Sequence, residues 1–255
     1  MIEKEAENAI RWIREYVEEV GAKGIVIGNS GGKDSATVLA MAVKAIGKEK
    51  VVAVSMPCYS NSNDFEDAKL VAETFGVKFL TVDLSNCYEQ MEKEIQCELN
   101  KIEIEELSKE GKINIKPRLR MTTLYGIAQT LGYLVIGTGN LCEAMVGYTT
   151  KWGDSASDFN PIANFTVPEV LEIGKYLGVP ERILKKAPND GLGGQTDEEK
   201  MGITYQQIAE MINTGETEEE AKQKILKKFQ ASKHKREPIP VYTFQRKNYL
   251  DKKEG

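Results

Sequence analysis

The stretch Gly24-Ile25-Val26-Ile27-Gly28-Asn29-Ser30-Gly31-Gly32-Lys33-Asp34-Ser35 decides the fold of this chain. It begins with a short apolar run, continues into a glycine-rich turn, and is followed by an apolar helical pattern over 36–46. This order is typical of a buried parallel strand that leads into a covering helix. Such a turn aims backbone N–H groups and a helix N-terminus at one point, which suits a phosphate group.

Asp34 makes this turn unusual among phosphate-binding loops. A carboxylate beside a polyphosphate is repelled by roughly 4 kcal/mol per charge pair at a separation of about 4 Å and an effective dielectric constant of about 20. The arrangement becomes favourable if a divalent cation lies between the two groups. The turn therefore predicts a nucleotide, a metal ion and an enzyme.

The rest of the chain alternates between short apolar runs and helical patterns. Further strands are predicted at 51–54, 79–82 and 134–136, and helices at 2–20, 35–46, 63–75, 85–107, 117–131, 168–177, 197–213 and 216–230. The apolar runs do not alternate with polar residues, so we expect the strands to be buried on both faces. This pattern predicts an α/β fold: a doubly wound, mostly parallel sheet with helices on both faces and extra C-terminal helices. We expect residues 100–115 to form a surface excursion, residues 148–165 and 187–199 to form loops, and residues 1–255 to form a single domain.

Composition excludes several classes of function. The net charge of −5 argues against a general nucleic-acid-binding surface. A single histidine, His234, rules out a multi-histidine metal site and leaves one residue for any Ser-His-Asp triad. The four cysteines form no C-x-x-C pair, and there is no signal peptide or membrane-spanning run. We therefore expect a cytoplasmic enzyme that uses carboxylates, cations, backbone dipoles and a hard metal ion.

A second group of polar residues follows the predicted strand at 134–136. It reads Gly137-Thr138-Gly139-Asn140-Leu141-Cys142-Glu143. Ligands of parallel sheets bind beyond the carboxyl ends of the strands, so Thr138 and Glu143 should face the same crevice as the first turn. Asp34 and Glu143 then form a candidate carboxylate pair for Mg²⁺, which prefers oxygen ligands.

The first turn fits two common nucleotide-binding patterns poorly. Relative to the Walker motif it is one residue short, and Asp34 stands where a Ser or Thr should be. It does not fit the Rossmann fingerprint either. The S-G-G-x-D-S pattern resembles the pyrophosphatase loop of the N-type ATP pyrophosphatases, which split ATP into AMP and pyrophosphate.

Further motifs make the resemblance more specific, and residues 24–245 look like an NH3-dependent NAD synthetase. In order, they are Pro117-Arg118-Leu119-Arg120-Met121, the G-T-G-N of 137–140 with Glu143, Gly147-Tyr148-Thr149-Thr150-Lys151-Trp152-Gly153-Asp154, Gly194-Gln195-Thr196-Asp197-Glu198 and His234-Lys235-Arg236. The resemblance implies an adenine nucleotide alpha hydrolase-like fold. It also implies ATP-dependent amidation of deamido-NAD⁺ with ammonia through an acyl-adenylate, giving NAD⁺, AMP and pyrophosphate. A homodimer that uses Mg²⁺, and that carries no glutaminase domain in this chain, is expected on the same ground.

The resemblance also assigns site residues. It implies ATP contacts from Gly28, Asn29, Ser30, Gly31, Gly32, Lys33, Asp34, Ser35, Thr138, Val167 and Asn189. Asp34 and Glu143 are the expected catalytic metal ligands, and Asp154 is a candidate for the ammonia site. The expected deamido-NAD⁺ contacts are Arg118, Lys151, Asp158, His234 and Lys235.

Three positions depart from the family pattern. Val167 stands where a lysine usually contacts the ATP phosphates, Asn189 where a Ser or Thr is usual, and Lys33 where the residue is usually apolar or Gln. We hypothesise that Lys33 supplies part of the cationic contact that Val167 cannot.

Two other readings compete with the synthetase. A tRNA-thiolating relative would share the loop, but it typically needs cysteine chemistry and a basic RNA-binding face. A non-catalytic nucleotide-binding module is suggested by Val167 and Asn189.

Overall fold

The fold is built on a four-stranded parallel sheet. The computed structural model describes residues 1–60, 62–186 and 196–243. The strands are β1 (Ile25–Gly28), β2 (Val51–Ser55), β3 (Lys78–Thr81) and β4 (Leu134–Ile136). They lie in the order β3-β2-β1-β4, and every neighbouring pair is parallel. The predicted doubly wound α/β fold is confirmed.

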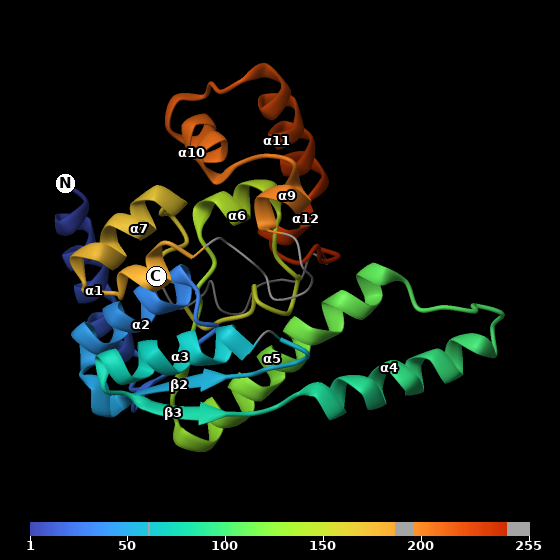
Figure 1. The fold of residues 1–255 in the computed structure, drawn as a ribbon, viewed down its shortest axis with the longest axis horizontal. Helices are drawn as coiled ribbons and strands as arrows, with labels where there is room; N and C mark the ends of the chain where they lie inside the picture. Colours follow the sequence, from blue (N-terminus) through green and yellow to red (C-terminus); the bar gives the residue numbers. More distant parts are fainter. Residues whose placement is uncertain (61, 187–195, 244–255) are drawn as a thin grey trace, which may run out of the picture.

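Helices cover both faces of the sheet, as Figure 1 shows. Successive residues of β1 point to opposite sides: Ile25 and Ile27 pack into one apolar cluster, while Val26 packs into another. The first cluster contains residues of α1 (Ile2–Glu19), α2 (Lys33–Ile46) and α7 (Val167–Tyr176), and the second contains residues of α5 (Lys109–Leu131). The chain also forms the short helix η1 (Lys48–Lys50) and the helices α3 (Ser62–Phe75) and α8 (Glu181–Leu184).

The burial predicted for the third strand was wrong. β1 and β2 are buried along their length, but most of β3 is exposed and Leu80 retains 42% of its accessible surface. The reason is strand order, since β3 is an edge strand with a neighbour on one side only. An apolar run identifies a strand, but it does not say which strand lies at the edge.

A helical arm projects from one end of the sheet (Figure 1). It is formed by α4 (Ser85–Asn100) and the first turns of α5. The predicted helix over 85–107 was therefore too long, and part of the predicted excursion is helical because α5 begins at Lys109. The Ser108 Oγ caps α5 by accepting a hydrogen bond from the Gly111 N–H at 3.1 Å.

The C-terminal helices form a third apolar cluster with α6 (Leu141–Val146). The helices that contribute to it are α9 (Asp197–Met201), α10 (Tyr205–Thr214) and α11 (Glu219–Ala231), and the short α12 (Lys233–Arg236) follows outside the cluster. Cys142, Ile208 and Ile225 meet in this cluster. The helix predicted over 197–213 is divided because Gly202 adopts a left-handed conformation, with φ of 68°, and ends α9.

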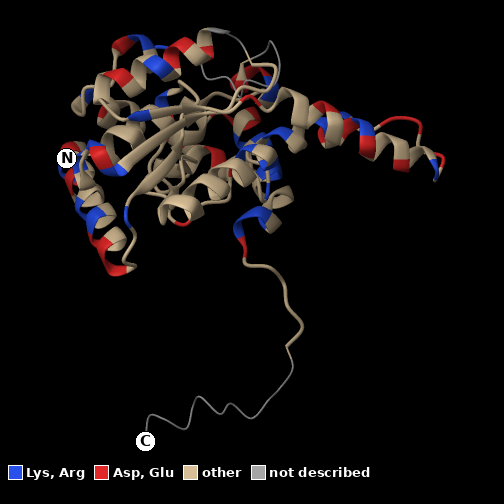
Figure 2. Ribbon diagram, turned by 90° about the horizontal axis from the view of Figure 1, so that it is seen from below, with Lys and Arg blue, Asp and Glu red and all other residues tan. Residues whose placement is uncertain are grey.

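Charges are distributed over the surface in both signs. In Figure 2, acidic and basic residues occur together along α1 and along the projecting arm. Within the described residues, no helix combines the length and the apolar character needed to cross a membrane.

Candidate active site

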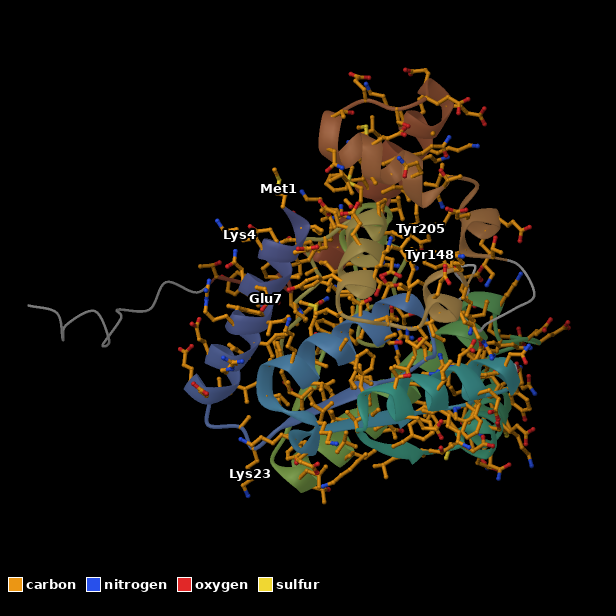
Figure 3. The ribbon with its side chains drawn as sticks, turned by 60° about the vertical axis from the view of Figure 1, so that its left-hand side comes forward. Met1, Lys4, Glu7, Lys23, Tyr148 and Tyr205 are labelled. Atoms are coloured by element: carbon orange, nitrogen blue, oxygen red, sulfur yellow. The ribbon has the colours of Figure 1, made fainter. Side chains whose placement is uncertain are left out.

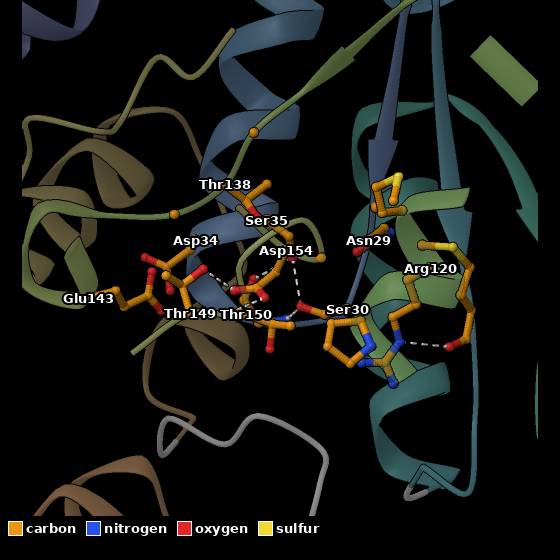
Figure 4. A pocket seen from close by; sticks show the side chains of 18 of the residues that line it. Asn29, Ser30, Asp34, Ser35, Arg120, Thr138, Glu143, Thr149, Thr150 and Asp154 are labelled. Carbon is orange, nitrogen blue, oxygen red and sulfur yellow. Dashed lines mark hydrogen bonds between the residues drawn. The ribbon is translucent and has the colours of Figure 1, made fainter. Parts of the chain in front are cut away.

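A cavity of about 490 Å³ opens at the carboxyl ends of β1, β2 and β4. Its wall includes the glycine turn after β1, the segment 55–57 after β2 and the segment 137–139 after β4. Figure 4 shows the side chains that converge there. Open parallel sheets bind ligands at this edge, and the volume falls in the range of ~300–1,000 Å³ that is common for small-molecule sites.

The turn after β1 is held in a shape that only glycine allows at Gly31. Its φ is +72°, and a Cβ there would lie 2.6 Å from the Asp64 carbonyl oxygen and 2.8 Å from the Ala68 nitrogen. Asn29 is buried, and its amide Nδ2 donates to the Ala68 carbonyl at 2.8 Å. The Asn29 side chain is therefore used to fix the turn against α3.

Two serines face each other across this turn. The hydroxyl oxygens of Ser30 and Ser35 are 3.1 Å apart, and the Gly32 N–H donates to Ser30 Oγ at 3.3 Å. Gly32 is the N-cap of α2 and has no side chain to satisfy the first N–H groups of the helix. These groups and the two hydroxyls form a cradle that suits an anion.

Asn140 joins the two predicted metal ligands. Its side-chain Nδ2 donates to Asp34 Oδ1 at 3.2 Å, and its backbone N–H donates to Glu143 Oε2 at 2.9 Å. The Glu143 N–H donates back to the Asn140 side chain at 3.0 Å, which completes a capping box at the start of α6. Asp34 and Glu143 thus lie on the same side of the cavity (Figure 4).

This carboxylate pair fits a hard divalent cation. Burial, followed by the nearby negative charge of Asp34, raises the pKa of Glu143 well above its ordinary value. Two neighbouring, partly buried carboxylates favour a cation between them. Mg²⁺ is commonly bound by one or two carboxylates together with water and phosphate oxygens. Over residues 1–60, 62–186 and 196–243, no set of three or more His, Cys, Asp or Glu side chains could hold a metal ion.

Lys33 lies directly beside the pair. Its Nζ is 3.0 Å from Asp34 Oδ2, and only 8% of the Lys33 side chain is exposed. The ammonium also lies 5.2 Å from the centre of the Tyr205 ring. Burial lowers the pKa of Lys33, but the surrounding carboxylates, Asp34 foremost, outweigh it and the net shift is upward. Lys33 is therefore a buried, charged ammonium.

The C-terminal helices close around this ammonium. Asp197 is buried at the start of α9 and accepts hydrogen bonds from Tyr148 at 3.1 Å and from Tyr205 at 3.4 Å. The two tyrosines lie side by side in Figure 3. Burial raises the pKa of Tyr205 first of all, and Glu143 and Asp197 add to that rise. Tyr205 is therefore a neutral hydrogen-bond donor in this site.

Asp154 is held by the loop that carries it. Its carboxylate accepts from the Thr149 hydroxyl and from the Thr150 N–H, both at 2.7 Å. Asp154 lines the cavity, as does Lys235. The structure thus places the candidate ammonia residue at the cavity, with each of its oxygens engaged in closing the turn at 149–154.

Four of the five residues expected to contact deamido-NAD⁺ form one cluster. The Arg118 guanidinium donates to the Lys151 carbonyl at 3.2 Å, and Lys151 Nζ donates to the His234 carbonyl at 2.8 Å. The neighbouring Lys235 donates to the carbonyls of Gly147 at 2.8 Å and Thr149 at 2.6 Å.

Asp158 lies apart from that cluster. Its carboxylate accepts from the Tyr125 hydroxyl at 3.2 Å and from the Val135 N–H at 2.7 Å. These bonds connect the segment at Asp158 to β4 and α5, so the carboxylate stabilises the contact between these segments.

One expected ATP contact, Val167, lies away from the cavity. Val167 is buried in the apolar cluster of the C-terminal helices, and its N–H donates to Cys142 Sγ at 3.5 Å. It is not part of the cavity wall. Asn189 lies outside the described residues.

Two cavity cations had no assigned role in the sequence-based prediction. Arg120 lines the wall, and its Nε donates to the Met56 carbonyl at 3.2 Å. Lys186 also lines the wall and pairs with Asp64 and Asp67, each at 2.7 Å. Arg120 occurs in the P-R-L-R-M motif, which could have drawn attention to it. Lys186 carries no comparable local signal.

Comparisons with known proteins identify the family of this chain. The family described as NAD synthase matches residues 5–240. The NH(3)-dependent NAD(+) synthetase of Carboxydothermus hydrogenoformans is 43% identical over 235 residues, which cover 92% of this chain and 95% of that protein. A solved NMN synthetase from Francisella tularensis has a TM-score of 0.89 and 35% identity, over 96% of this chain and 99% of that chain. The NH3-dependent NAD synthetase from Campylobacter jejuni has a TM-score of 0.77 and 26% identity, over 95% of this chain and 100% of that chain. This chain belongs to the NAD synthase family.

Proposed function

We propose that the cavity carries out both steps of the ATP-dependent amidation of deamido-NAD⁺ by ammonia. The chain is a ligase that forms a C–N bond, as its family membership and its NH(3)-dependent relatives support. The observation that carries the proposal is the Asp34–Asn140–Glu143 arrangement beside an anion-binding turn at the end of β1. An ATP site that combines a phosphate cradle with a carboxylate pair suits cleavage at the α-phosphate.

The cavity offers separate places for the base and the phosphates of ATP. One part of its wall is apolar and is formed by Met56, Ile113, Pro117, Met121 and Leu124. This part suits an adenine ring, and the Met56 backbone stands beside it with its carbonyl held by the Arg120 guanidinium. The phosphates would then extend toward the serines and the N-terminus of α2.

In the first step, a carboxylate oxygen of the nicotinate ring attacks the α-phosphorus of ATP, and the bond to pyrophosphate breaks. The carboxylate is ionised near pH 7, so this chain need not supply a general base. The turn N–H groups and the Ser30 and Ser35 hydroxyls stabilise the negative charge that develops on the phosphoryl oxygens. When bound, Mg²⁺ would be held by Asp34 and Glu143 and would add Lewis-acid stabilisation of that charge.

In the second step, the nitrogen of ammonia attacks the acyl carbon, and AMP leaves. Ammonia is mostly NH₄⁺ near pH 7, so one proton passes to solvent before attack, and a second leaves the nitrogen for solvent as the amide forms and AMP departs. Asp154 faces the cavity and carries the charge to attract the cation, while the Thr149 and Thr150 bonds fix its position. We assign the deamido-NAD⁺ contacts to the cluster of Arg118, Lys151, His234 and Lys235.

One assay tests the proposal directly. Pyrophosphate release is measured with ATP, Mg²⁺ and deamido-NAD⁺, with either ammonium chloride or glutamine as the nitrogen source. We expect NAD⁺ and stoichiometric pyrophosphate with ammonium and no amide product with glutamine. Binding of ATP without pyrophosphate release would instead favour a non-catalytic module. AMP release that needs tRNA would favour the thiolating reading.

A second substrate is a candidate because the Francisella structure, with a TM-score of 0.89, is described as an NMN synthetase. Amidation of nicotinate mononucleotide would use the same adenylation and the same ammonia attack, without the adenylyl half of deamido-NAD⁺. Comparing kcat/KM for the two substrates decides between them.

The homodimer stays a proposal that rests on the family resemblance, and the single domain over residues 1–255 and the cytoplasmic location stay proposals that rest on the pattern and composition of the sequence. Sedimentation equilibrium of the whole chain, with and without deamido-NAD⁺, tests the dimer. A monomer that turns over at the full rate would contradict it.

A further inference from the structure

Both Asp34 oxygens are engaged within the chain. Oδ1 accepts from Asn140 at 3.2 Å, and Oδ2 accepts from Lys33 at 3.0 Å. Asp34 is also one of the two carboxylates that we propose as metal ligands. A divalent cation that binds Asp34 must therefore displace one of these two donors or share the oxygen with it.

Lys33 is the donor that can move. Asn140 is fixed on both sides, since its side chain caps α6 and its backbone N–H binds Glu143. The Lys33 ammonium is held by one hydrogen-bonded ion pair and by the face of the Tyr205 ring, on a flexible four-carbon stem. Lys33 also lines the cavity, so space is open to the ammonium on the nucleotide side.

The negative charges around Lys33 are the same ones that a divalent cation bound to Asp34 would meet. Asp34, Glu143 and Asp197 all interact electrostatically with the ammonium. A partly buried pair of carboxylates is costly without a cation, and the buried Lys33 provides one from within the chain. A lysine and a divalent ion beside the same Asp34 oxygen repel each other.

We propose that Lys33 is a tethered cation that holds the Asp34–Glu143 pair when no nucleotide is bound and competes there with the divalent ion. The inference rests on the proposed metal site. ATP brings phosphate oxygens that draw the ammonium off Asp34, so the divalent ion binds tightly only together with the nucleotide. The role concerns metal affinity before ATP binds, which is separate from a contact between Lys33 and the phosphates.

The test is Mn²⁺ binding to the whole chain, measured by electron paramagnetic resonance without nucleotide and with α,β-methylene-ATP, whose α–β bond is not cleaved. Lys33→Gln removes the charge. Lys44→Gln is the matched control because Lys44 lies on the same helix and also forms an ion pair, with Glu7 at the surface. Asp34→Asn removes the proposed ligand.

We expect Lys33→Gln to bind Mn²⁺ about tenfold more tightly than the unmodified chain without nucleotide, which corresponds to about 1.4 kcal/mol. With the ATP analogue the difference should shrink to about twofold or less. Lys44→Gln should match the unmodified chain, and Asp34→Asn should lose the site. Without metal, Lys33→Gln should melt at a lower temperature, and Mn²⁺ should raise its melting temperature more than that of the unmodified chain.

Two results would overturn the inference, and only the second would also reject the proposed metal site. If Lys33→Gln binds Mn²⁺ no more tightly while Asp34→Asn still loses the site, Lys33 is only a structural ion pair and the proposed metal site stands. If Asp34→Asn binds Mn²⁺ unchanged, the metal ion binds elsewhere, and both the inference and the proposed ligand pair fail.

Discussion

Replacing Asn140 separates the two tasks that this residue performs. Its side-chain oxygen caps α6, and its amide nitrogen donates to Asp34. Asn140→Ser keeps an N-cap acceptor of similar quality but removes the amide donor. Asn140→Ala removes both. The comparison therefore assigns one free-energy difference to the cap and another to the bond that positions the metal ligand.

The magnitudes follow from the contacts. A hydrogen bond to a charged group contributes about 1.5–3 kcal/mol, so Asn140→Ser should lose that much free energy of unfolding. We expect the loss of free energy of unfolding to lie at the low end of this range, because 18% of the Asp34 side chain is exposed. Loss of the cap costs about 1 kcal/mol more, which gives about 2.5–4 kcal/mol for Asn140→Ala.

Activity should fall together with stability in the Asn140→Ser variant. Without its amide partner, Asp34 can turn away from Glu143, and a shift of about 1 Å in a catalytic group can lower the rate by up to ~100-fold. We expect Asn140→Ser to lower kcat for pyrophosphate release by about tenfold or more and to raise the Mg²⁺ concentration needed for half-maximal rate.

Urea unfolding gives the stabilities, and pyrophosphate release over a Mg²⁺ titration gives the activities. Ser108→Ala is the matched control because Ser108 caps α5 on the projecting arm, away from the cavity. It should lose about 1 kcal/mol and keep its activity. If Asn140→Ser shows the kcat and Mg²⁺ dependence of the unmodified chain, Asn140 does not position Asp34, and the reasoning is refuted.

Three further outcomes are expected. Gly31→Ala should abolish pyrophosphate release while circular dichroism still shows a folded chain, because its Cβ would meet backbone atoms of α3; full activity would mean that the turn can shift. Burial lowers the pKa of Lys235, so this lysine loses its charge at a lower pH than an ordinary lysine does. The KM for deamido-NAD⁺ should therefore rise as pH rises. The Lys235→Arg variant stays charged, and the same rise of KM in that variant would contradict the assignment. Lys33→Ala should raise KM for ATP or lower kcat, and unchanged values of both would reject a phosphate contact from Lys33.

Most of the sheet could be predicted because its signals are local. Short apolar runs identify β1, β2 and β4, and the glycine turn identifies the start of α2. The exposure of β3 could not be predicted, since strand order depends on contacts between distant segments. The start of α5 was missed because residues 100–115 are charged and weakly patterned, whereas Ser108 provides the cap.

The candidate site could be predicted where its residues lie in the two glycine-containing turns. Asp34, Asn140 and Glu143 occur in motifs, and the parallel topology places both motifs at one edge of the sheet. The separate position of Asp158 could not be predicted in this way. Its carboxylate is used by the backbone of β4 and by Tyr125, and neither partner is near it in the sequence.

The orientation of the Lys33 side chain is a property that could not be predicted from the sequence alone. The sequence suggested a phosphate contact for Lys33 because Val167 cannot supply a cation, and neighbouring residues on a helix do not normally face each other. The ammonium turns to Asp34 because α9 and α10 cover it with Asp197 and the Tyr205 ring. α9 and α10 thus contribute to the candidate site rather than being an addition to the sheet. A change at Tyr205 should therefore alter metal binding at Asp34 even though their positions are far apart in the chain.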